Sequence, residues 1–284
     1  HGAGLAVFVW MPVRAMDWAV QRHPDWQDWS FDPASGALRP SGRLDSWRPD
    51  VQRYLVRLLT DLAGSGIDGL LFGEDLFVGE YGGLGPAARA RFAAEFQRTP
   101  RPELFWSRAA DSSLPSKAPT RLPMFWRWAG WKSRAAGEQM AELVRALRTA
   151  HPGLLVAQNV APEAISRPAE ALARWNLDLL ALAPAVDYVA VLTYPEPGQS
   201  LSAAAGELTE LVDRAVQLVG AADRIMIKVP LMDRRTGRLL PDSQIGRFLA
   251  AAQRDHAPGV AYLYNSEKIR RVPHRSLARP SRLD

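Results

Sequence analysis

The sequence predicts an α/β protein built on a (β/α) barrel of the TIM type. The first strand in this chain is expected to be the third strand of the barrel. Short apolar runs alternate with amphipathic helical patterns about six times, which is typical of a parallel sheet with helices packed outside it. The 284 residues are enough for one large domain of this class. A doubly wound open sheet is the alternative, but the glycine-rich first turn that usually opens such a sheet is absent.

Six apolar runs have the length and composition of buried strands. Most are rich in β-branched or aromatic residues, and they are bounded by glycine, proline or polar residues. The runs are 4–13, 66–75, 154–160, 186–194, 224–231 and 259–264. A closed barrel of this type needs eight strands, and the chain begins directly on one of the six. The first two strand–helix units are therefore expected upstream of residue 1.

Amphipathic patterns between these runs predict the helices. In 49–63 apolar residues recur every three or four positions, and a proline occupies the first turn. The second half of 124–150 shows the same periodicity. The remaining predicted helices are 86–96, 168–180, 201–219 and 242–254.

The whole chain, residues 1–284, is predicted to be a single barrel-type domain. Residues 14–48 and 97–123 are rich in Pro, Gly, Asp and Ser, which predicts two long loops over the rim of the barrel. The first of these loops contains four tryptophans, so it is expected to be folded. Residues 270–284 are basic and contain prolines, which suggests a peripheral tail.

Composition narrows the function classes. The absence of cysteine excludes disulfides, thiolate nucleophiles and zinc–cysteine sites. The net charge of +5 is interpreted as a solvated basic surface, because nucleic-acid binding would need a basic stripe interleaved with aromatics. No apolar run approaches the roughly 20 residues that cross a bilayer. The chain begins at His1 without a signal-like segment, so it is expected to be part of a longer protein.

The run 66–75 stops abruptly at two acids, Glu74 and Asp75. If all strands are parallel, their carboxyl ends share one rim, where the active sites of β/α proteins lie. Other strand ends and the long loops bring aromatic, amide and charged side chains to the same rim. The candidate substrate-binding residues are Trp10, Trp18, Arg43, Trp128, Lys132, Asn159, Tyr194, Glu196, Lys228, Tyr264 and Glu267.

This set of side chains is typical of a carbohydrate site. Aromatic rings stack on sugar faces, and glycosidic cleavage needs a proton donor and a second group. Adjacent residues of an extended strand point to opposite faces, so only one of Glu74 and Asp75 is expected to enter the lumen. The other would orient it, raise its pKa through like charge, or cap the next helix. A buried Lys228 would need a partner, for which a rim acid is the natural choice. Trp10 and Trp18 could equally belong to the core.

The sequence shows no motif for a metal site, a serine nucleophile or a phosphate-binding loop. The five histidines are scattered and show no metal-ligand spacing, and no GxSxG serine-nucleophile motif is present. The glycine-rich stretch 79–85 matches neither a phosphate-binding loop nor a dinucleotide fingerprint. Neither a metal nor a cofactor is therefore expected.

Six short motifs, in this order, resemble one known family. They are WMPV at 10–13, RL at 43–44, DGLLFGED at 68–75, WKSRA at 131–135, QNVAP at 158–162 and VAVLTYPE at 189–196. Over nearly its whole length the sequence resembles the C-terminal glycosidase domain of the PgaB-type poly-β-1,6-N-acetylglucosamine N-deacetylases, glycoside hydrolase family 153.

The resemblance implies a (β/α) barrel that cleaves partially deacetylated poly-β-1,6-N-acetylglucosamine, a biofilm exopolysaccharide. It also implies two strand–helix units before the WMPV strand and a deacetylase domain further upstream. The implied location is the periplasm, the outer membrane or the cell exterior. The family usually has His-Asp-Asp where this chain has Gly73-Glu74-Asp75. Because Asp75 matches the family, it is slightly preferred over Glu74 as the catalytic residue.

Two functions remain open from the sequence. The first is an endo-acting glycosidase on a hexosamine polymer, with Glu74 or Asp75 as general acid. Its second group would be Glu196, a carboxylate from the upstream strands, or the substrate's own acetamido group. The alternative is a non-catalytic polysaccharide-binding or export module that keeps the barrel and its aromatic groove.

Overall fold

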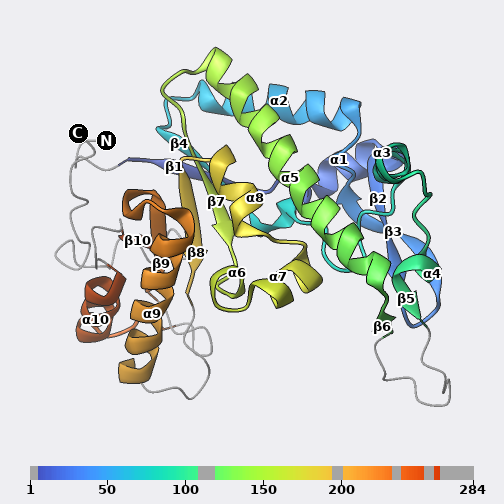
Figure 1. Cartoon of the computed structure of the whole chain (residues 1–284). Helices are drawn as coiled ribbons and strands as arrows, with labels where there is room; N and C mark the ends of the chain where they lie inside the picture. The colour runs from blue at the N-terminus through green and yellow to red at the C-terminus, as the bar shows by residue number, and fades with distance from the viewer. Residues whose placement is uncertain (1–5, 108–118, 194–200, 232–237, 253–258, 263–284) are drawn as a thin grey trace.

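A computed structural model describes residues 6–107, 119–193, 201–231, 238–252 and 259–262. At its centre is a parallel six-stranded sheet, in which the strands have the same order as in the chain (Figure 1). The strands are β1 (Phe8–Met11), β4 (Gly69–Phe72), β7 (Leu155–Val160), β8 (Tyr188–Leu192), β9 (Ile225–Pro230) and β10 (Gly259–Tyr262). All six predicted strands are confirmed. β1 and β10 form the two edges of the sheet, so the described part of the barrel is open.

Helices connect successive strands of the sheet, as the alternating pattern predicts. The long ones are α2 (Pro49–Ala63), α5 (Pro123–Ala150), α9 (Leu201–Val219) and α10 (Asp242–Ala252). The predicted helix 168–180 is shorter in the structure, as α7 (Pro168–Trp175), and two short helices flank it, α6 (Glu163–Ser166) before it and α8 (Leu179–Leu182) after it. The break after α7 has a local cause, because Asn176 adopts a left-handed conformation that ends the helix.

The two faces of the sheet carry different side chains. One face packs against the helices and forms the first core, which is mainly aliphatic; its strand residues include Leu70, Phe72, Val156, Val160, Val189, Val191, Ile225, Ile227 and Val229. Because side chains alternate along a strand, the intervening residues point to the inner face. These inner residues include Phe8, Trp10, Asn159, Tyr188 and Lys228. Phe8 and Tyr188 meet edge to face, with 6.2 Å between ring centroids.

A second core lies beneath the first half of α5 and is mainly aromatic. Its large residues are Trp47, Phe92, Phe105, Trp106, Phe125, Trp128 and Trp131. Trp128 stacks on Phe105 and on Trp131 with 5.0 Å between centroids in each pair. Stacked and edge-to-face rings are favourable beyond the area that they bury. In Figure 1 the elements around this core lie on the right, beside the sheet.

The expectation that residues 14–48 form a loop without regular structure is wrong. The segment contains α1 (Asp17–Arg22), a 3-10 turn and a hairpin of β2 (Gln27–Asp32) and β3 (Ala37–Leu44). The hairpin turn has a recognisable signal, since the carboxylate of Asp32 accepts from the N–H of Ala34 (3.0 Å) and the hydroxyl of Ser35 (2.8 Å). The prolines of this segment hid the strands.

Residues 97–123 are partly structured. They contain α4 (Pro102–Phe105) and a short pair of β5 (Trp106–Ser107) and β6 (Thr120–Arg121), after the predicted helix α3 (Pro86–Phe96). The stretch 108–118 and the predicted tail 270–284 lie outside the described residues.

Candidate active site

The carboxyl ends of β1 and β4 meet at the acid corner, defined here as Gly73, Glu74 and Asp75. The N–H of Gly73 donates to the main-chain oxygen of Met11 at 2.9 Å, so the two strands stay paired up to the corner. The two acids then begin a short 3-10 turn, η2 (Glu74–Leu76). Glu74 is exposed and Asp75 is half-buried.

Asp75 is bound by the main chain that follows β1. The N–H of Val13 donates to both carboxylate oxygens, at 3.1 and 3.0 Å. The N–H groups of Arg14 and Ala15 donate to Oδ2, each at 2.6 Å. A proton donor for a glycosidic oxygen needs one oxygen that faces the substrate. These contacts give Asp75 a structural role, and the slight preference for it as the catalytic residue stays a prediction.

Glu74 is the exposed carboxylate of the corner, and it acts on Lys228 of β9. Burial lowers the pKa of the Lys228 ammonium, and the charge of Glu74 opposes that shift. Lys228 Nζ also donates to Oδ1 of Asn159 on β7, at 3.2 Å. Both residues are at least nine-tenths buried. A rim acid was expected as the partner of Lys228: the charge of Glu74 acts on it, and Asn159 adds an amide oxygen as a hydrogen-bond acceptor.

Trp10 offers an open aromatic face beside this corner. Its side chain is 58% exposed although it lies on a strand of the sheet. A Cβ added to Gly73 would lie 3.5 Å from Cζ2 of Trp10 and 2.7 Å from Oδ1 of Asp75. Glycine at position 73 therefore leaves room for both side chains. An accessible indole beside a carboxylate is the arrangement that sugar stacking requires.

Gln158 holds the corner from β7, although the sequence did not assign it to the site. Its Nε2 donates to the main-chain oxygen of Gly73 at 2.7 Å, and its side chain is fully buried. A glutamine inside an otherwise apolar strand is the signal that could have identified it, because a buried amide needs partners.

A buried charge cluster, also missed from the sequence, fixes the segment after β1 from its other side. Arg14 Nη2 and Asp28 Oδ2 form an ion pair at 2.6 Å. Asp28 also accepts from the N–H groups of Gly83 (3.0 Å) and Gly85 (3.1 Å). Asp45 lies close by, and burial, with the charge of Asp28 second, raises its pKa to about 7. The cluster ties the rim segment to the second core.

Two candidate substrate-binding residues are corrected by the structure. Trp128 is fully buried among the rings of the second core, so it cannot stack on a sugar. Lys132 is 1% exposed, and its ammonium donates to the main-chain oxygens of Gly79 (2.9 Å), Glu80 (3.1 Å) and Gly82 (3.1 Å). Both residues lie in the first half of α5, which packs into the second core and does not cover the rim.

Trp18 and Arg43 lie on the segment that connects β1 to α2. Trp18 of α1 is 52% exposed, and its indole N–H donates to the hydroxyl of Tyr54 at 3.0 Å. Arg43 is exposed on β3, and no hydrogen bond or ion pair joins its guanidinium to the acid corner among the described residues. Four further candidates lie outside the described residues: Tyr194, Glu196, Tyr264 and Glu267.

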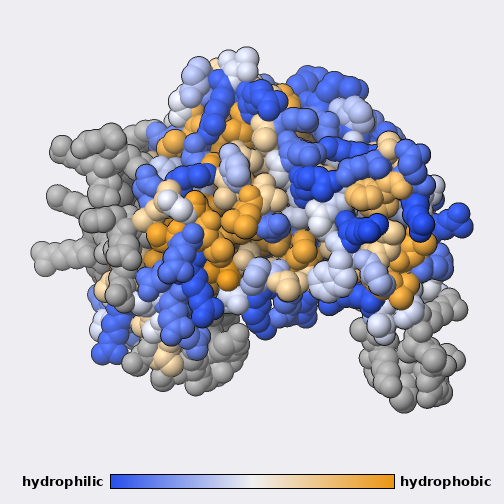
Figure 2. Space-filling model, viewed as in Figure 1, coloured by the Kyte–Doolittle hydropathy of each residue, from blue (hydrophilic) through white to orange (hydrophobic). Residues whose placement is uncertain are grey.

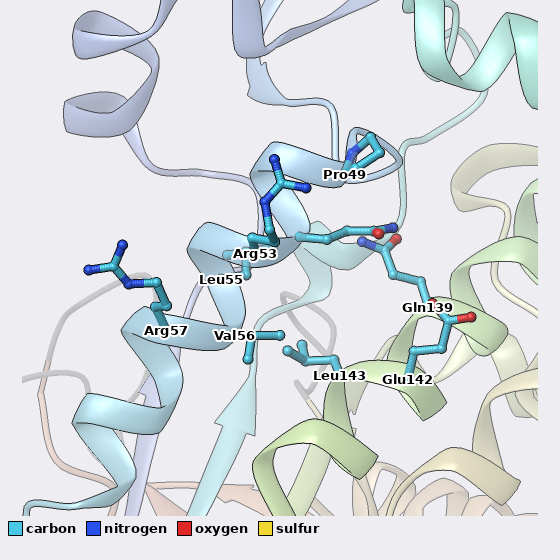
Figure 3. Close-up of a pocket in the computed structure, with 9 residues that line it drawn as sticks. Pro49, Arg53, Leu55, Val56, Arg57, Gln139, Glu142 and Leu143 are labelled. Atoms are coloured by element: carbon cyan, nitrogen blue, oxygen red, sulfur yellow. The ribbon is translucent and has the colours of Figure 1, made fainter. Parts of the chain in front are cut away.

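A cavity of about 500 Å³ lies elsewhere, between α2 and α5 (Figure 3). Its lining includes Leu55, Val56 and Leu143, with Arg57 and Glu142. No candidate residue lines it. Figure 2 shows an apolar area where α8 lies in Figure 1, and Leu180 of that helix is 60% exposed. Neither feature belongs to the acid corner.

Two further searches cover the described part of the chain only. No group of three or more acidic or histidine side chains there is arranged to hold a metal ion. None of the described helices is both long and apolar enough to cross a membrane.

The fold is shared with known glycoside hydrolases. It is similar to the PgaB (BpsB) glycoside hydrolase domain from Bordetella bronchiseptica, with a TM-score of 0.67 and 19% identity over 92% of this chain and 71% of that chain. It is also similar to a β-galactosidase from Rahnella sp. R3, with a TM-score of 0.60 and 17% identity over 92% of this chain and 40% of that one. These matches confirm the predicted barrel class.

A third similar structure is a β-galactosidase from the psychrophilic Marinomonas ef1, with a TM-score of 0.56 and 12% identity over 93% of this chain and 44% of that one. The chain spans less than half the length of either galactosidase. No curated protein matches the sequence. The model of the family described as hypothetical glycosyl hydrolase family 13 (GHL13), however, matches residues 2–263, nearly the whole chain. The protein therefore belongs to this glycosyl hydrolase family.

Proposed function

We propose that this protein is an endo-acting glycoside hydrolase on partially deacetylated poly-β-1,6-N-acetylglucosamine, and that Glu74 is its essential carboxylate. The observation that carries the proposal is the different use of the two acids at the corner. The oxygens of Asp75 are taken up by main-chain N–H groups, whereas Glu74 is exposed near the open indole of Trp10. Membership of the glycosyl hydrolase family and the fold shared with the PgaB domain support the reaction class.

Glu74 can take one of two parts in the reaction. It can protonate the leaving oxygen as a general acid, or its carboxylate can attack the anomeric carbon or stabilise the positive charge that develops on the sugar ring. We propose the second part for Glu74, whose charge acts on Lys228 of the inner face. The proton donor is then a second group, for which Glu196 is the sequence candidate.

The substrate class follows from the resemblance and from the charges at the corner. Deacetylated units of the polymer carry ammonium groups, so a net basic protein must recognise them through local acids such as Glu74. Such a substrate is an exopolysaccharide, so we propose that the protein acts in the periplasm, at the outer membrane or outside the cell. If an upstream deacetylase domain is present in the full-length protein, it would supply partially deacetylated chains.

The test is the release of new reducing ends from partially deacetylated polymer. Wild type is expected to cut it, and Glu74→Gln to cut it at least about a hundredfold more slowly. Glu142→Gln is the matched control and should behave like wild type, because Glu142 is an exposed acid that lines the cavity between α2 and α5. Equal rates for wild type and Glu74→Gln would reject the assignment. Binding of the polymer without any product would favour the non-catalytic module.

A further inference from the structure

Trp18 is an exposed aromatic side chain whose orientation is fixed. Its indole N–H donates to the hydroxyl of Tyr54 at 3.0 Å, while 52% of the side chain stays exposed. Tyr54 belongs to α2, so the contact joins α1 and α2 through two residues that are 36 positions apart in the chain. A hydrogen bond at the edge of the ring holds its plane and leaves ring surface accessible, so the side chain is preorganised to stack on a ligand.

Tyr54, which holds Trp18, is itself packed in a row with two further rings, Trp26 and His23. Tyr54 lies 5.4 Å from Trp26, measured between ring centroids, and Trp26 stacks on His23 at 3.9 Å with an interplanar angle of 13°. All three supporting rings are partly buried, and Trp26 and Tyr54 pack against the first core. We call Trp18, His23, Trp26 and Tyr54 the aromatic platform. It is anchored to the core and presents one largely exposed ring.

The platform is connected to the acid corner through a rigid segment. Asp75 holds the N–H groups of residues 13–15, and α1 begins two residues later at Asp17. The ion pair of Arg14 with Asp28 holds the same segment from its other side. Along the chain, Trp10 of β1 precedes this segment and Trp18 of α1 follows it. The segment therefore joins the two exposed indoles through main chain that is held from both sides.

We propose that the aromatic platform is a distal subsite that stacks one sugar of a hexosamine chain whose other units occupy the acid corner. The inference rests on the proposed function, because it takes the same polymer as ligand. Asp17 fits the chemistry of a partly deacetylated chain. It is an exposed carboxylate next to Trp18, and no basic side chain of the described residues forms an ion pair with it. It is thus available to the ammonium of a glucosamine unit.

The consequence is a dependence of affinity on chain length. Short oligosaccharides reach only the corner, whereas longer ones reach both surfaces and gain from the second contact. Trp18→Ala is expected to weaken binding of long oligosaccharides roughly five- to tenfold and to leave the affinity for short ones unchanged. Tyr54→Phe, which keeps the ring but removes the hydroxyl that fixes Trp18, should cause a smaller loss of the same kind.

The experiment is calorimetric titration of the whole chain with partially deacetylated poly-β-1,6-N-acetylglucosamine oligosaccharides, from dimer to octamer. Glu74→Gln serves as the background so that the ligand is not cut. Trp126→Ala is the matched control, because Trp126 is 44% exposed on α5 and takes no part in the platform. Trp18→Tyr, which keeps a stacking ring, should restore most of the long-chain gain.

The outcomes separate this inference from the proposed function. A loss confined to long chains supports the distal subsite, even if wild type releases no product and the hydrolase assignment fails. An equal loss for all lengths overturns the distal subsite, because Trp18 would then act at the corner itself. No loss at any length also overturns it, as does an equal effect of Trp126→Ala. If no oligosaccharide binds, both proposals fall.

Discussion

The two cores of this protein differ in composition and in what they position. The first core is aliphatic, lies between the sheet and its helices, and brings Glu74, Asn159 and Lys228 to the carboxyl ends of the strands. The second core is aromatic, and buried charges at its edge hold the rim segments that surround the corner. The difference teaches that the barrel positions the proposed reacting groups, while the segments inserted between its strands and helices fix the main chain around them.

The largest effect is expected from opening the second core. Trp128→Ala should lower the free energy of unfolding by about 3–5 kcal/mol, because it removes a fully buried indole that packs between other rings. Urea denaturation measures this change. Trp126→Ala, at a 44% exposed position of the same helix, should stay within about 0.5 kcal/mol of wild type. If stability were unchanged and polysaccharide binding were weakened, Trp128 would instead be a substrate-binding residue at the rim.

A pH-dependent effect on stability is expected at Asp45, which lies between Leu44 of the first core and Trp47 of the second. Burial and the charge of Asp28 raise its pKa from 3.8 to about 7, against smaller opposing contributions from Arg14 and Arg48. Because the folded protein binds this proton more tightly than the unfolded chain, the contribution to stability is complete below about pH 4 and is lost as pH rises through 7. At pH 8 Asp45→Asn should be more stable than wild type by up to about 4 kcal/mol.

The comparison is made by chemical denaturation of both proteins at pH 4.5 and at pH 8. The advantage of Asp45→Asn should shrink to about 1 kcal/mol at pH 4.5, where Asp45 is protonated in the folded protein but still mostly ionised in the unfolded chain. Asp61→Asn, at an exposed position of α2, controls for the lost charge and should show no such dependence. A constant difference between Asp45→Asn and wild type across this range would contradict the assignment.

A smaller effect is expected from Lys132→Met. The substitution keeps the side-chain volume but leaves the three main-chain oxygens of residues 79, 80 and 82 without their donor. Stability should fall by about 2–3 kcal/mol, since buried acceptors are costly to leave unpaired. Thermal unfolding gives the readout, and hydrogen exchange of residues 79–85 should rise selectively. Selective loss of substrate binding at unchanged stability would instead support a rim position for Lys132.

The first core was predictable because its signals are local. The six strands and the helices that cover them follow from period-2 and period-3.6 patterns, and each predicted strand matches within a few residues. Asn159 of β7 and Lys228 of β9 were expected on one rim because parallel strands bring their carboxyl ends together, and a hydrogen bond joins their side chains across β8.

The second core was not predictable in the same way, because its structure depends on contacts between distant parts of the chain. Trp128 and Trp131 resemble rim aromatics until Phe92 and Phe105 are seen to pack on them. Asp28 and Arg14 look like surface charges in a loop, yet they form a buried pair. The hairpin of β2 and β3 was hidden by its prolines, although the turn at Asp32 was visible in the sequence.

The different parts taken by Glu74 and Asp75 are tested most directly by measuring kcat/KM and Tm side by side for Glu74→Gln and Asp75→Asn. Glu74→Gln should lose at least about a hundredfold in kcat/KM with an unchanged Tm. Asp75→Asn should lower Tm by about 2–4 °C per kcal/mol lost, because an amide cannot accept from three N–H groups as a carboxylate does. It should keep most of its activity well below Tm. The reverse pattern, with activity lost only in Asp75→Asn and stability unchanged, would contradict the assignment of Glu74 as the reacting carboxylate.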